Sequence, residues 1–588
     1  MTSSGGVTMR GHIDFKRNGI KLSGQPLIPA HTANSNTNPL GCCLPSSTST
    51  SNFSNSAITF LPFLCILWAQ ETSTGRENEL EITYAYPIEC AYSDNLETSD
   101  NMQFQLPYED AKRKVRVASE IMFIDIESTK SELPSEDRDM KTCDLILKYS
   151  YPFSQFNPFT EEFHQQSIFV IINPHSGKGT ALEIFNDKVR PILEGAHCNI
   201  TVQLTDYQGH ATDLARELNI DEYDTILCAS GDGIPYEVIN GFYQRPDRAQ
   251  AFSKINIVQS PGGSGNAMSL SCLGATSASL SALRILKGKP SQCDLMAISK
   301  SSSDEVILSF LSQTYGAIAQ ADIGTEWMRF IGGIRFDLGV AYEVLSGKKY
   351  PCELAFKIKC KNNDEVMEHY QNEVGKYKNN SSTYSNLKNN NRDIQGARGI
   401  YRDDSVEFDF TEQSQDKNVS CGLQLRKLTE DDFQLKYHEE FREDTSMRRL
   451  PEDWEIYDKD KTENMRIFYS GKMPYIAATT NFFPAALPAD GAIDLVVFDS
   501  RSKFASTANA LLSLEKGTHV WDDCVEHMKV EAFRLEPKST TPCYISVDGE
   551  RFPYETFQVE VLKGVLRTIL WEGNYTVTGF LENGYSSK

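Results

Sequence analysis

The chain has 588 residues, of which 40% are hydrophobic, and carries a formal net charge of -22 at pH 7. A chain of this length can bury more than one hydrophobic core, so we expect two or more domains. The negative charge argues against a general nucleic-acid binder, because phosphate contacts need a basic surface. The 14 cysteines form no Cys-x-x-Cys pair and no alternation with histidine, which argues against a zinc site and a disulfide framework.

The N-terminal third of the chain predicts little regular structure at first and short strands later. Residues 1–55 are low in complexity and polar, so we expect a disordered tail without a signal peptide, and a cytoplasmic protein. The apolar run at residues 57–69 is too short to span a bilayer and contains Pro62, which favours a buried strand. Residues 56–162 are interpreted as a small β-rich extension, with strand-like pieces at 80–85, 114–117 and 121–124.

Strand-like and helix-like segments alternate from residue 163 to residue 295, which predicts an α/β domain with a doubly wound parallel sheet. The predicted strands are 168–172, 225–229 and 255–259. Apolar residues recur at helical spacing between them, at Leu182, Phe185, Val189, Leu193, Leu214 and Leu218. A ligand is expected at the carboxyl ends of such strands.

Four glycine-containing turns lie among these segments, at residues 173–180, 205–211, 230–233 and 261–266. Glycine lets backbone N–H groups come close to an oxyanion, and a helix N-terminus that follows adds partial positive charge. The series therefore predicts a phosphate-binding site. It matches neither the Gly-x-x-x-x-Gly-Lys-Ser/Thr loop of P-loop NTPases nor a Gly-x-Gly-x-x-Gly dinucleotide turn after the first strand.

Asp232 stands between two glycines in the third turn. A carboxylate inside a phosphate cradle repels the ligand unless it holds Mg²⁺ or takes a proton from the attacking hydroxyl. The alternative is an aspartate that only stabilises its own turn by a side-chain hydrogen bond to the backbone. The glycine-rich loop at residues 262–266 favours the chemical role.

The pattern changes after residue 296 to short strands, which predicts an antiparallel, β-sandwich-like C-terminal domain formed by residues 296–360 and 465–580. The predicted strands are 306–310, 494–498, 530–534, 544–547 and 558–562. Residues 361–464 are strongly polar apart from a helix-like stretch at 364–377, so we expect a mostly mobile insertion there.

Several segments taken together resemble one enzyme family. They read NPHSGKG, LTDYQGHA, ASGDGIPYEVINGF, PGGSGNAMS and SQTYGAIAQADIGTEWMRFIGGIRFDLG, followed by FFPAALPADGAIDLVV, LEKGTH, AFRLEP and SVDGE. In this series the chain resembles the lipid kinases of the diacylglycerol-kinase catalytic family, in particular the sphingosine or sphingoid long-chain base kinases. The resemblance covers residues 165–358 and 465–575, and the N-terminal extension and polar insertion are similar to those of the fungal members.

The resemblance implies roles for individual residues. Asp232 is the expected general base that activates the primary hydroxyl of the lipid, and Asp322 is expected to hold the amino and hydroxyl groups of the sphingoid head. The substrate is also expected to contact Ser230, Gly231 and Gly233. The nucleotide is expected to contact Asn173, Pro174, His175, Thr205, Asp206, Tyr207, Gln208, Gly209, Glu237, Gly263, Ser264, Gly265, Arg329, Arg335, Asp548, Gly549 and Glu550. The resemblance assigns no residue to a metal, although ATP and Mg²⁺ are the expected cofactors.

Side-chain chemistry supports two of these assignments independently. A cationic amine that enters an apolar pocket needs a nearby carboxylate, which Asp322 would supply; a surface acid after a strand is the alternative. Arg329 and Arg335 would oppose the negative charge of the phosphates, and two solvated arginines are the alternative. Because residues six apart lie about 600° around a helix and on different faces, a bend at residues 332–333 is expected between them.

Two further features bear on the lipid and the nucleotide. A predicted helix at residues 507–516 lies where these kinases enclose the acyl tail, and ordinary core packing is the alternative for its leucines, Leu511, Leu512 and Leu514. The first loop has His175 and Ser176 where this branch more often has two glycines, and Thr180 stands where lysine is frequent. These departures concern how tightly the nucleotide is held.

The sequence therefore predicts an ATP- and Mg²⁺-dependent kinase that phosphorylates the primary hydroxyl of sphinganine, phytosphingosine or sphingosine to the 1-phosphate. One alternative is a diacylglycerol or ceramide kinase, in which Asp322 would have no cation to hold. A catalytically silent lipid-binding scaffold is the other, and the intact Asp232 argues against it. A relative of NAD kinases is disfavoured because Ile234 stands where threonine usually follows the Gly-Asp-Gly turn.

A membrane surface is the expected partner besides the lipid, because the substrate sits in a bilayer. We expect peripheral attachment at the cytosolic face of the endoplasmic reticulum, Golgi or plasma membrane. Cys42 and Cys43 are adjacent in the polar tail and could accept two acyl chains such as palmitate, which together would hold the protein firmly. Two unmodified cytosolic thiols are the alternative.

Overall fold

The computed structural model describes residues 9–15, 17–23, 60–76, 78–87, 112, 114–127, 129–153, 156–157, 162–163, 165–177, 179–263, 265–325, 334–381, 425–540 and 543–587. The described residues form two compact units, one before Gln165 and one from Gln165 onward.

The N-terminal unit is a curled six-stranded sheet with one helix packed on it. Its strands are β1 (Met9–Asp14), β2 (Gly19–Ser23), β3 (Phe60–Pro62), β4 (Ile66–Glu71), β5 (Glu79–Pro87) and β6 (Val115–Asp125), in the order β3-β2-β1-β6-β5-β4. Only residues 63–65 separate β3 from β4, which lie at opposite ends of this order, so the sheet must curl until its edges approach each other. Helix α1 (Thr142–Ser150) contacts β4 and buries Leu145 and Ile146. A separate hairpin joins β7 (Phe156–Asn157) to β8 (Glu162–Phe163).

Residues 9–23 correct one expectation from the sequence. They supply β1 and β2, with Ile13 and Ile20 fully buried, whereas the sequence analysis predicts a disordered tail over 1–55. Their short alternation of apolar and polar residues is surrounded by a low-complexity sequence, which hides it. The apolar run at residues 57–69 contributes β3 and β4 to the core, as its reading as buried strand predicts.

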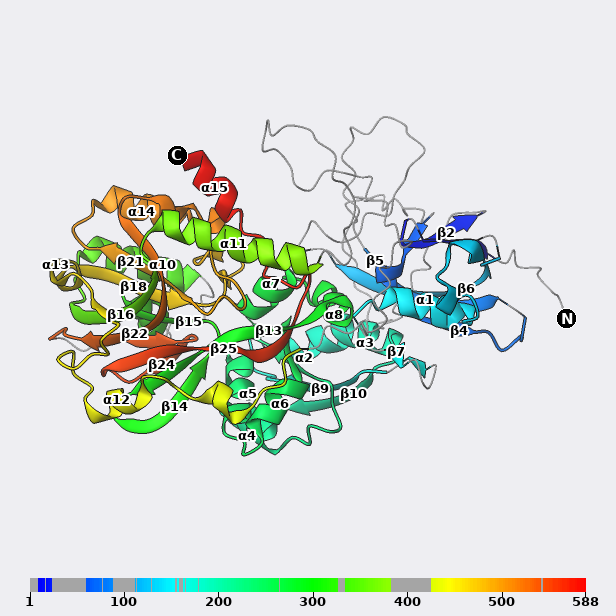
Figure 1. Cartoon of the computed structure of the whole chain (residues 1–588), viewed down its shortest axis with the longest axis horizontal. Helices are drawn as coiled ribbons and strands as arrows, with labels where there is room; N and C mark the ends of the chain where they lie inside the picture. Colours follow the sequence, from blue (N-terminus) through cyan, green and yellow to red (C-terminus); the bar gives the residue numbers. More distant parts are fainter. Residues whose placement is uncertain are drawn as a thin grey trace, which may run out of the picture. The chain divides into compact units, whose positions relative to one another are not determined.

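The second unit begins with an α/β domain built on four parallel strands. These are β9 (Ser167–Ile172), β10 (Asn199–Leu204), β11 (Thr225–Ser230) and β12 (Asn256–Pro261), in the order β10-β9-β11-β12. The helices between and after them are α2 (Ala181–Ile184), α3 (Arg190–Gly195), α4 (His210–Glu217), α5 (Gly233–Tyr243), α6 (Arg248–Lys254), α7 (Ala267–Leu273) and α8 (Ala278–Lys287). Figure 1 shows this domain in green. The doubly wound class predicted from the sequence is confirmed.

The burial of the four strands explains which of them the sequence reveals. Strands β11 and β12 are buried at every position and β9 at nearly every position, which matches their continuous apolar runs. Strand β10 lies at the edge of the sheet and is half-exposed. Its sequence therefore lacks the continuous apolar run that marks the other three strands, and the sequence analysis does not predict it. No single helix in the described ranges is long and apolar enough to cross a membrane; only the bent pair α7 and α8 reaches that length and hydropathy together.

An antiparallel sheet of eleven strands forms the rest of the second unit. The strands are β13 (Lys289–Lys300), β14 (Ser303–Ser309), β15 (Ser312–Gly316), β16 (Cys352–Cys360), β17 (Glu455–Ile456), β18 (Met465–Gly471), β21 (Ile493–Asp499), β22 (Val525–Pro537), β23 (Ile545–Val547), β24 (Glu550–Phe552) and β25 (Phe557–Leu570). A small hairpin adds β19 (Tyr475–Ala477) and β20 (Thr480–Asn481). The helices are α9 (Ala317–Gly324), α10 (Ile334–Ser346), α11 (Asn363–Ser381), α12 (His438–Glu443), α13 (Lys459–Glu463), α14 (Phe504–Leu512) and α15 (Phe580–Ser587).

The long strands β13 and β25 connect the large sheet to the α/β domain, as Figure 1 shows. Arg567 near the end of β25 donates from Nε to Asn256 Oδ1 of β12 at 2.9 Å and from Nη1 to Ser253 O at 2.7 Å. Strand β13 begins at Lys289 and pairs with β25 from its first residue, so the predicted domain boundary at 295 falls within β13.

A chain of buried charges runs through the large sheet. Lys472 Nζ lies 2.9 Å from Asp294 and 2.5 Å from Asp490, and Lys529 Nζ lies 3.0 Å from Asp490 and 2.7 Å from Asp494. All five side chains are fully buried. Loss of one member would leave a buried charge without its partner and destabilise the domain by about 3 to 5 kcal/mol.

The polar insertion is more ordered at its ends than the sequence predicts. Residues 363–381 form α11, and residues 425–464 pack along the large sheet with Tyr437 and Trp454 buried against Ala355 and Ala532. The aromatic anchors are too irregularly spaced to give a helix or strand pattern. Residues 382–424, the middle of the insertion, lie outside the described residues.

Candidate functional site

Three of the predicted glycine turns meet at the carboxyl ends of the parallel strands. Strands β9 and β11 are neighbours although β10 separates them in the sequence, so their following loops flank the point where the chain changes direction across the sheet, the usual ligand site of such folds. The N–H of Gly231 donates to Ser176 Oγ at 3.1 Å. A Cβ atom on Gly263 would lie 2.4 Å from the Cα of Gly231, so this close approach of two loops requires glycine.

Asp232 lies in the middle of this junction and is half-buried. Its Oδ1 accepts from Gln259 Nε2 at 3.1 Å and from the N–H of Met268 at 3.2 Å, and its Oδ2 accepts from the N–H of Ala267 at 3.1 Å. A Cβ on Gly265 would lie 2.5 Å from Oδ2. These hydrogen-bond donors come from β12 and the start of α7, and not from the turn of Asp232 itself.

Two opposing effects act on the Asp232 carboxyl. Burial is the larger and raises its pKa above the ordinary value, while the donors from Ala267, Met268 and Gln259 lower it. A carboxylate with a raised pKa is more basic than an exposed aspartate, which suits a general base.

Asn266 shapes the third loop from within. Its Oδ1 accepts from the N–H groups of Gly262 and Gly263 at 3.1 and 3.0 Å, and its Nδ2 donates to Gly263 O at 2.8 Å. Its φ of 54° lies in the left-handed region, which asparagine tolerates better than most residues. The loop is thus held open by its own last residue; Ser264 lies outside the described residues.

The first loop is exposed and follows β9 directly. Asn173 Oδ1 accepts from the N–H of His175 at 2.9 Å, and Asn173 O accepts from the N–H of Ser176 at 3.1 Å. Gly177 and Gly179 have φ values of 61° and 75°, a conformation that favours glycine. Ser176, the residue after His175, contacts Gly231. Contact of Asn173, Pro174 and His175 with a nucleotide remains a prediction.

Glu237 supports the second predicted loop. From α5 its carboxylate accepts from the N–H groups of Gly209 and Ala211 at 3.1 and 3.0 Å. These N–H groups lie at the N-terminus of α4, where they have no partner within the helix, so Glu237 stabilises the start of α4. It also stabilises the turn at Gly209, whose φ is 91°. Burial raises the pKa of Glu237. Within this loop the half-exposed Tyr207 ring stacks on His210 at 4.6 Å, and Thr205, Asp206 and Gln208 complete it.

The turn of residues 548–550 reaches the α/β domain from the large sheet. Glu550 Oε1 lies 3.8 Å from the position of a Cβ on Gly233. Asp548 is buried and accepts from Ser309 Oγ at 2.6 Å and from the N–H groups of Phe310, Leu311 and Ser312. Burial raises the pKa of Asp548 to about 6. Asp548 thus anchors the strand connection, while Gly549, with φ of 83°, and Glu550 form the part of the turn that faces outward.

Asp322 lies on α9 in the large-sheet domain. Its Oδ2 accepts from Ser546 Oγ of β23 at 3.1 Å, and the side chain is half-buried. This hydrogen bond joins α9 to the neighbouring strand β23 and orients the carboxylate.

The remaining predicted residues cannot be placed as side chains. Arg335 lies in α10, of which only the backbone is described at that position, and Arg329 lies outside the described residues. Cys42 and Cys43 also lie outside them. The sequence analysis does not predict three other residues at the junction, namely Ser176, Gln259 and Asn266. Gln259 could have been identified from the sequence, because a glutamine is unusual inside an apolar strand such as β12.

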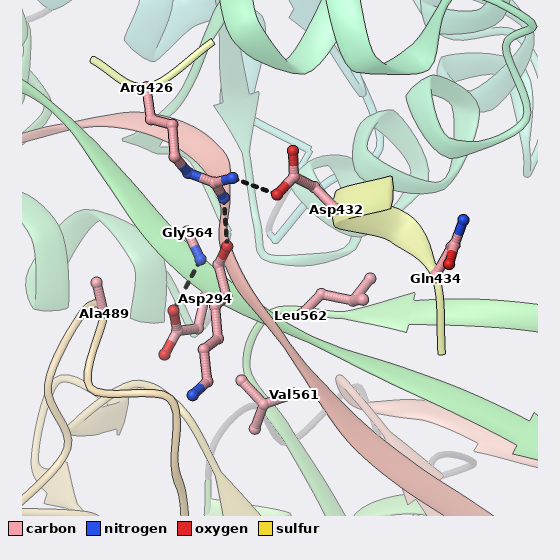
Figure 2. Close-up of a pocket in the computed structure, with 9 residues that line it drawn as sticks. Asp294, Arg426, Asp432, Gln434, Ala489, Val561, Leu562 and Gly564 are labelled. Atoms are coloured by element: carbon pink, nitrogen blue, oxygen red, sulfur yellow. Dashed lines mark hydrogen bonds and ion pairs between the residues drawn. The ribbon is translucent and has the colours of Figure 1, made fainter. Parts of the chain in front are cut away.

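Neither a metal cluster nor the surface pocket drawn in Figure 2 marks this junction. In the described ranges no group of three His, Cys, Asp or Glu side chains could hold a metal ion. Magnesium does not require such a group when phosphates supply most of its ligands. The pocket in Figure 2 lies over the large sheet and contains no predicted site residue; Arg426 closes it by donating to Lys563 O at 3.1 Å and pairing with Asp432.

Comparison with known proteins supports both domains. Residues 167–298 match the diacylglycerol kinase catalytic domain, and residues 459–570 match the YegS C-terminal NAD kinase beta sandwich-like domain. The chain is 41% identical over 472 residues to sphingoid long chain base kinase 5 of Saccharomyces cerevisiae, covering 78% of this chain and 66% of that protein. It is 31% identical over 420 residues to sphingoid long chain base kinase 4 of Schizosaccharomyces pombe, covering 71% and 76%. It is 27% identical to sphingosine kinase 1 of Arabidopsis thaliana over 455 residues, covering 73% and 80%.

Proposed function

The chain belongs to the sphingoid long-chain base kinases of the diacylglycerol-kinase catalytic family, and we propose that it transfers the γ-phosphoryl group of ATP to the primary hydroxyl of a sphingoid long-chain base. The products are the 1-phosphate of the base and ADP. The observation that carries the proposal is the position of Asp232, a half-buried carboxylate with a raised pKa at the meeting point of three glycine loops.

The Asp232 carboxylate is held in place by the side chain of Gln259 and by the main-chain N–H groups of Asn266, Ala267 and Met268. We propose that this oriented carboxylate takes the proton of the lipid hydroxyl. The deprotonated oxygen then attacks the γ-phosphorus, ADP leaves, and the backbone N–H groups of the loops face the phosphates.

ATP with Mg²⁺ supplies the phosphoryl group and neutralises part of its charge. Asn173, His175, Gly209 and Gly263 lie on the loops that would border the nucleotide. Arg329 and Arg335 are proposed to add positive charge at the phosphates.

The choice of a sphingoid base over a neutral lipid rests on Asp322. A half-buried carboxylate that is oriented by the Ser546 hydroxyl offers negative charge to an ammonium group that would otherwise be costly to bury. Diacylglycerol and ceramide carry no such group. A catalytically silent scaffold would have no use for a carboxylate held as Asp232 is.

The proposal is tested with radiolabelled ATP and four acceptors offered side by side, namely sphinganine, phytosphingosine, diacylglycerol and ceramide. We expect label in the two sphingoid bases only. Label in diacylglycerol or ceramide at comparable rates would refute the assignment of substrate class, and no label in any lipid would refute the kinase activity.

We also propose that the outer surface of α10 and α14 touches the membrane that holds the substrate. These helices contact each other, and each exposes large apolar side chains: Tyr342 and Leu345 on α10 are 63% and 68% exposed, and Phe504 and Leu512 on α14 are 51% and 82% exposed. Exposed aromatic and aliphatic side chains of this kind can insert at the headgroup level of a bilayer.

Replacing Leu345 and Leu512 by serine together is expected to lower binding to vesicles of phosphatidylcholine and phosphatidylserine several-fold, since about 25 cal/mol is lost per Å² of apolar surface no longer buried. Sedimentation with vesicles measures the effect. Activity on detergent-dispersed base should stay near wild type. Ile456→Ser is the matched control, because Ile456 on β17 is 69% exposed outside these helices. Equal losses in both variants would contradict a specific surface.

Acylation of Cys42 and Cys43 is proposed as a second attachment. Each buried CH₂ contributes about 0.8 kcal/mol, so two acyl chains hold a protein far more firmly than one. Cys42→Ser with Cys43→Ser should move the protein from the membrane to the soluble fraction of cells, with unchanged activity on detergent-dispersed substrate. Unchanged fractionation would leave α10 and α14 as the attachment.

A further inference from the structure

Gln259 occupies an unusual place for a polar side chain. It lies on β12, between apolar neighbours of the parallel sheet, and is only 1% exposed. Its main-chain oxygen accepts from Ser281 Oγ at 3.1 Å. Burying a primary amide is costly unless its donors and acceptor are all used, so its partners indicate why it is there.

The hydrogen bonds of the Gln259 amide define its orientation. Oε1 accepts from the N–H of Ser269 at 2.8 Å, which forces the opposite end of the amide, Nε2, to face the glycine turn. Nε2 donates to Asp232 Oδ1 at 3.1 Å and to Ser230 O at 3.3 Å. One side chain therefore joins the end of β11, the carboxylate and helix α7.

We propose that Gln259 is the positioning residue of the general base: its Nε2 holds Oδ1 of Asp232 and so fixes the plane of the carboxylate that meets the lipid hydroxyl. This inference rests on the proposed function. Among the residues that the structure describes, Gln259 is the side chain that donates to Asp232, whereas the other donors are the main-chain N–H groups of Asn266, Ala267 and Met268.

The direction of the effect follows from the charge balance. Burial raises the pKa of Asp232 and the Gln259 amide opposes it. Without the amide the carboxylate gains freedom to rotate and becomes harder to ionise. Activity requires the ionised form, so the low-pH limb of the rate profile moves to higher pH.

The test uses Gln259→Met, which keeps the length of the side chain and removes both donors. We expect kcat to fall about 10- to 100-fold. The KM values for ATP and for the base should change less than about threefold, because Gln259 is not expected to contact either substrate. The low-pH midpoint of kcat should rise by roughly one unit. A wild-type kcat and midpoint in the folded variant would overturn the inference.

Asn256→Leu is the matched control for the loss of a buried amide. Asn256 lies at the other end of β12 and bonds Asp224 O at 3.2 Å and Arg567 Nε at 2.9 Å, far along the strand from the glycine turn. Asn256→Leu should lower the melting temperature as Gln259→Met does, yet leave the low-pH midpoint of kcat unchanged. The same pH shift in both variants would assign the effect to stability and overturn the positioning role.

Gln259→Glu keeps the acceptor for Ser269 and covers the case in which Gln259→Met does not fold. A second carboxyl beside Asp232 disfavours ionisation of the pair, so its midpoint should rise further than that of Gln259→Met; an unmoved midpoint contradicts the inference. A wild-type chain that phosphorylates no sphingoid base would overturn the proposed function itself, whereas an active wild type with unaffected Gln259 variants overturns only the role of Gln259.

Discussion

Asp232→Asn is expected to abolish phosphoryl transfer while ATP still binds. The substitution preserves size and removes the proton acceptor, and loss of a general base typically lowers kcat by about 10² to 10⁴-fold. Because the amide oxygen of asparagine can take the place of Oδ1 and accept from Gln259 and Met268, most of the contacts that hold the loops should remain. Single-turnover assays with sphinganine, together with nucleotide binding by fluorescence, separate the two effects.

Asp224→Asn is the control for this experiment. Asp224 lies just before β11, at the opposite end of the strand that leads to Asp232, and its Oδ2 also accepts from a backbone N–H, that of Ser167, at 2.8 Å. It should retain nearly full activity. If Asp232→Asn keeps more than about a tenth of wild-type kcat, Asp232 is not the base.

The pH dependence of the wild type supplies a further check on Asp232. Burial raises the pKa of this carboxyl, and the base works only when ionised. The rate should therefore decline with falling pH at a higher pH than for an exposed aspartate, whose pKa is about 3.9. Asp232→Asn should show no such limb.

Asp322→Ala is expected to raise KM for the sphingoid base by at least tenfold and leave KM for ATP nearly unchanged. The variant would leave the ammonium group of a bound base without its partner, and breaking a buried charge pair costs roughly 3 to 5 kcal/mol, less where water enters. Steady-state kinetics with each substrate varied in turn measure the difference.

Ser546→Ala tests the same site as Asp322→Ala and should have a smaller effect. It removes the hydroxyl that orients Asp322 at 3.1 Å but keeps the charge, so KM for the base should rise only a few-fold, as expected for one hydrogen bond of about 1 kcal/mol. Equal effects of Asp322→Ala on both substrates would remove Asp322 from the lipid site.

The fold class was predictable because its main signals are local. Strands β9, β11 and β12 are buried on both faces and appear as continuous apolar runs, and short strands after residue 296 give a different pattern. The edge strand β10, the strands of residues 9–23 and the aromatic anchors Tyr437 and Trp454 were not recognised. The strands of residues 9–23 and the two aromatic anchors are buried by contacts with distant segments, which no local pattern reports, and β10 is a half-exposed edge strand without a continuous apolar run.

The sequence by itself determined where the phosphate-binding loops lie and that Asp232 stands among them, because close backbone approach requires glycine and leaves a visible mark at positions 231, 233, 263 and 265. Only the tertiary structure decided what surrounds that carboxylate. Its donors Gln259, Ala267 and Met268 are 27, 35 and 36 residues away, and parallel strand order brings them together. The same holds for Asp548 and Glu237, whose carboxylates accept from the backbone of other segments, since hydrogen bonds that stabilise loops depend on spatial neighbours and not on sequence spacing.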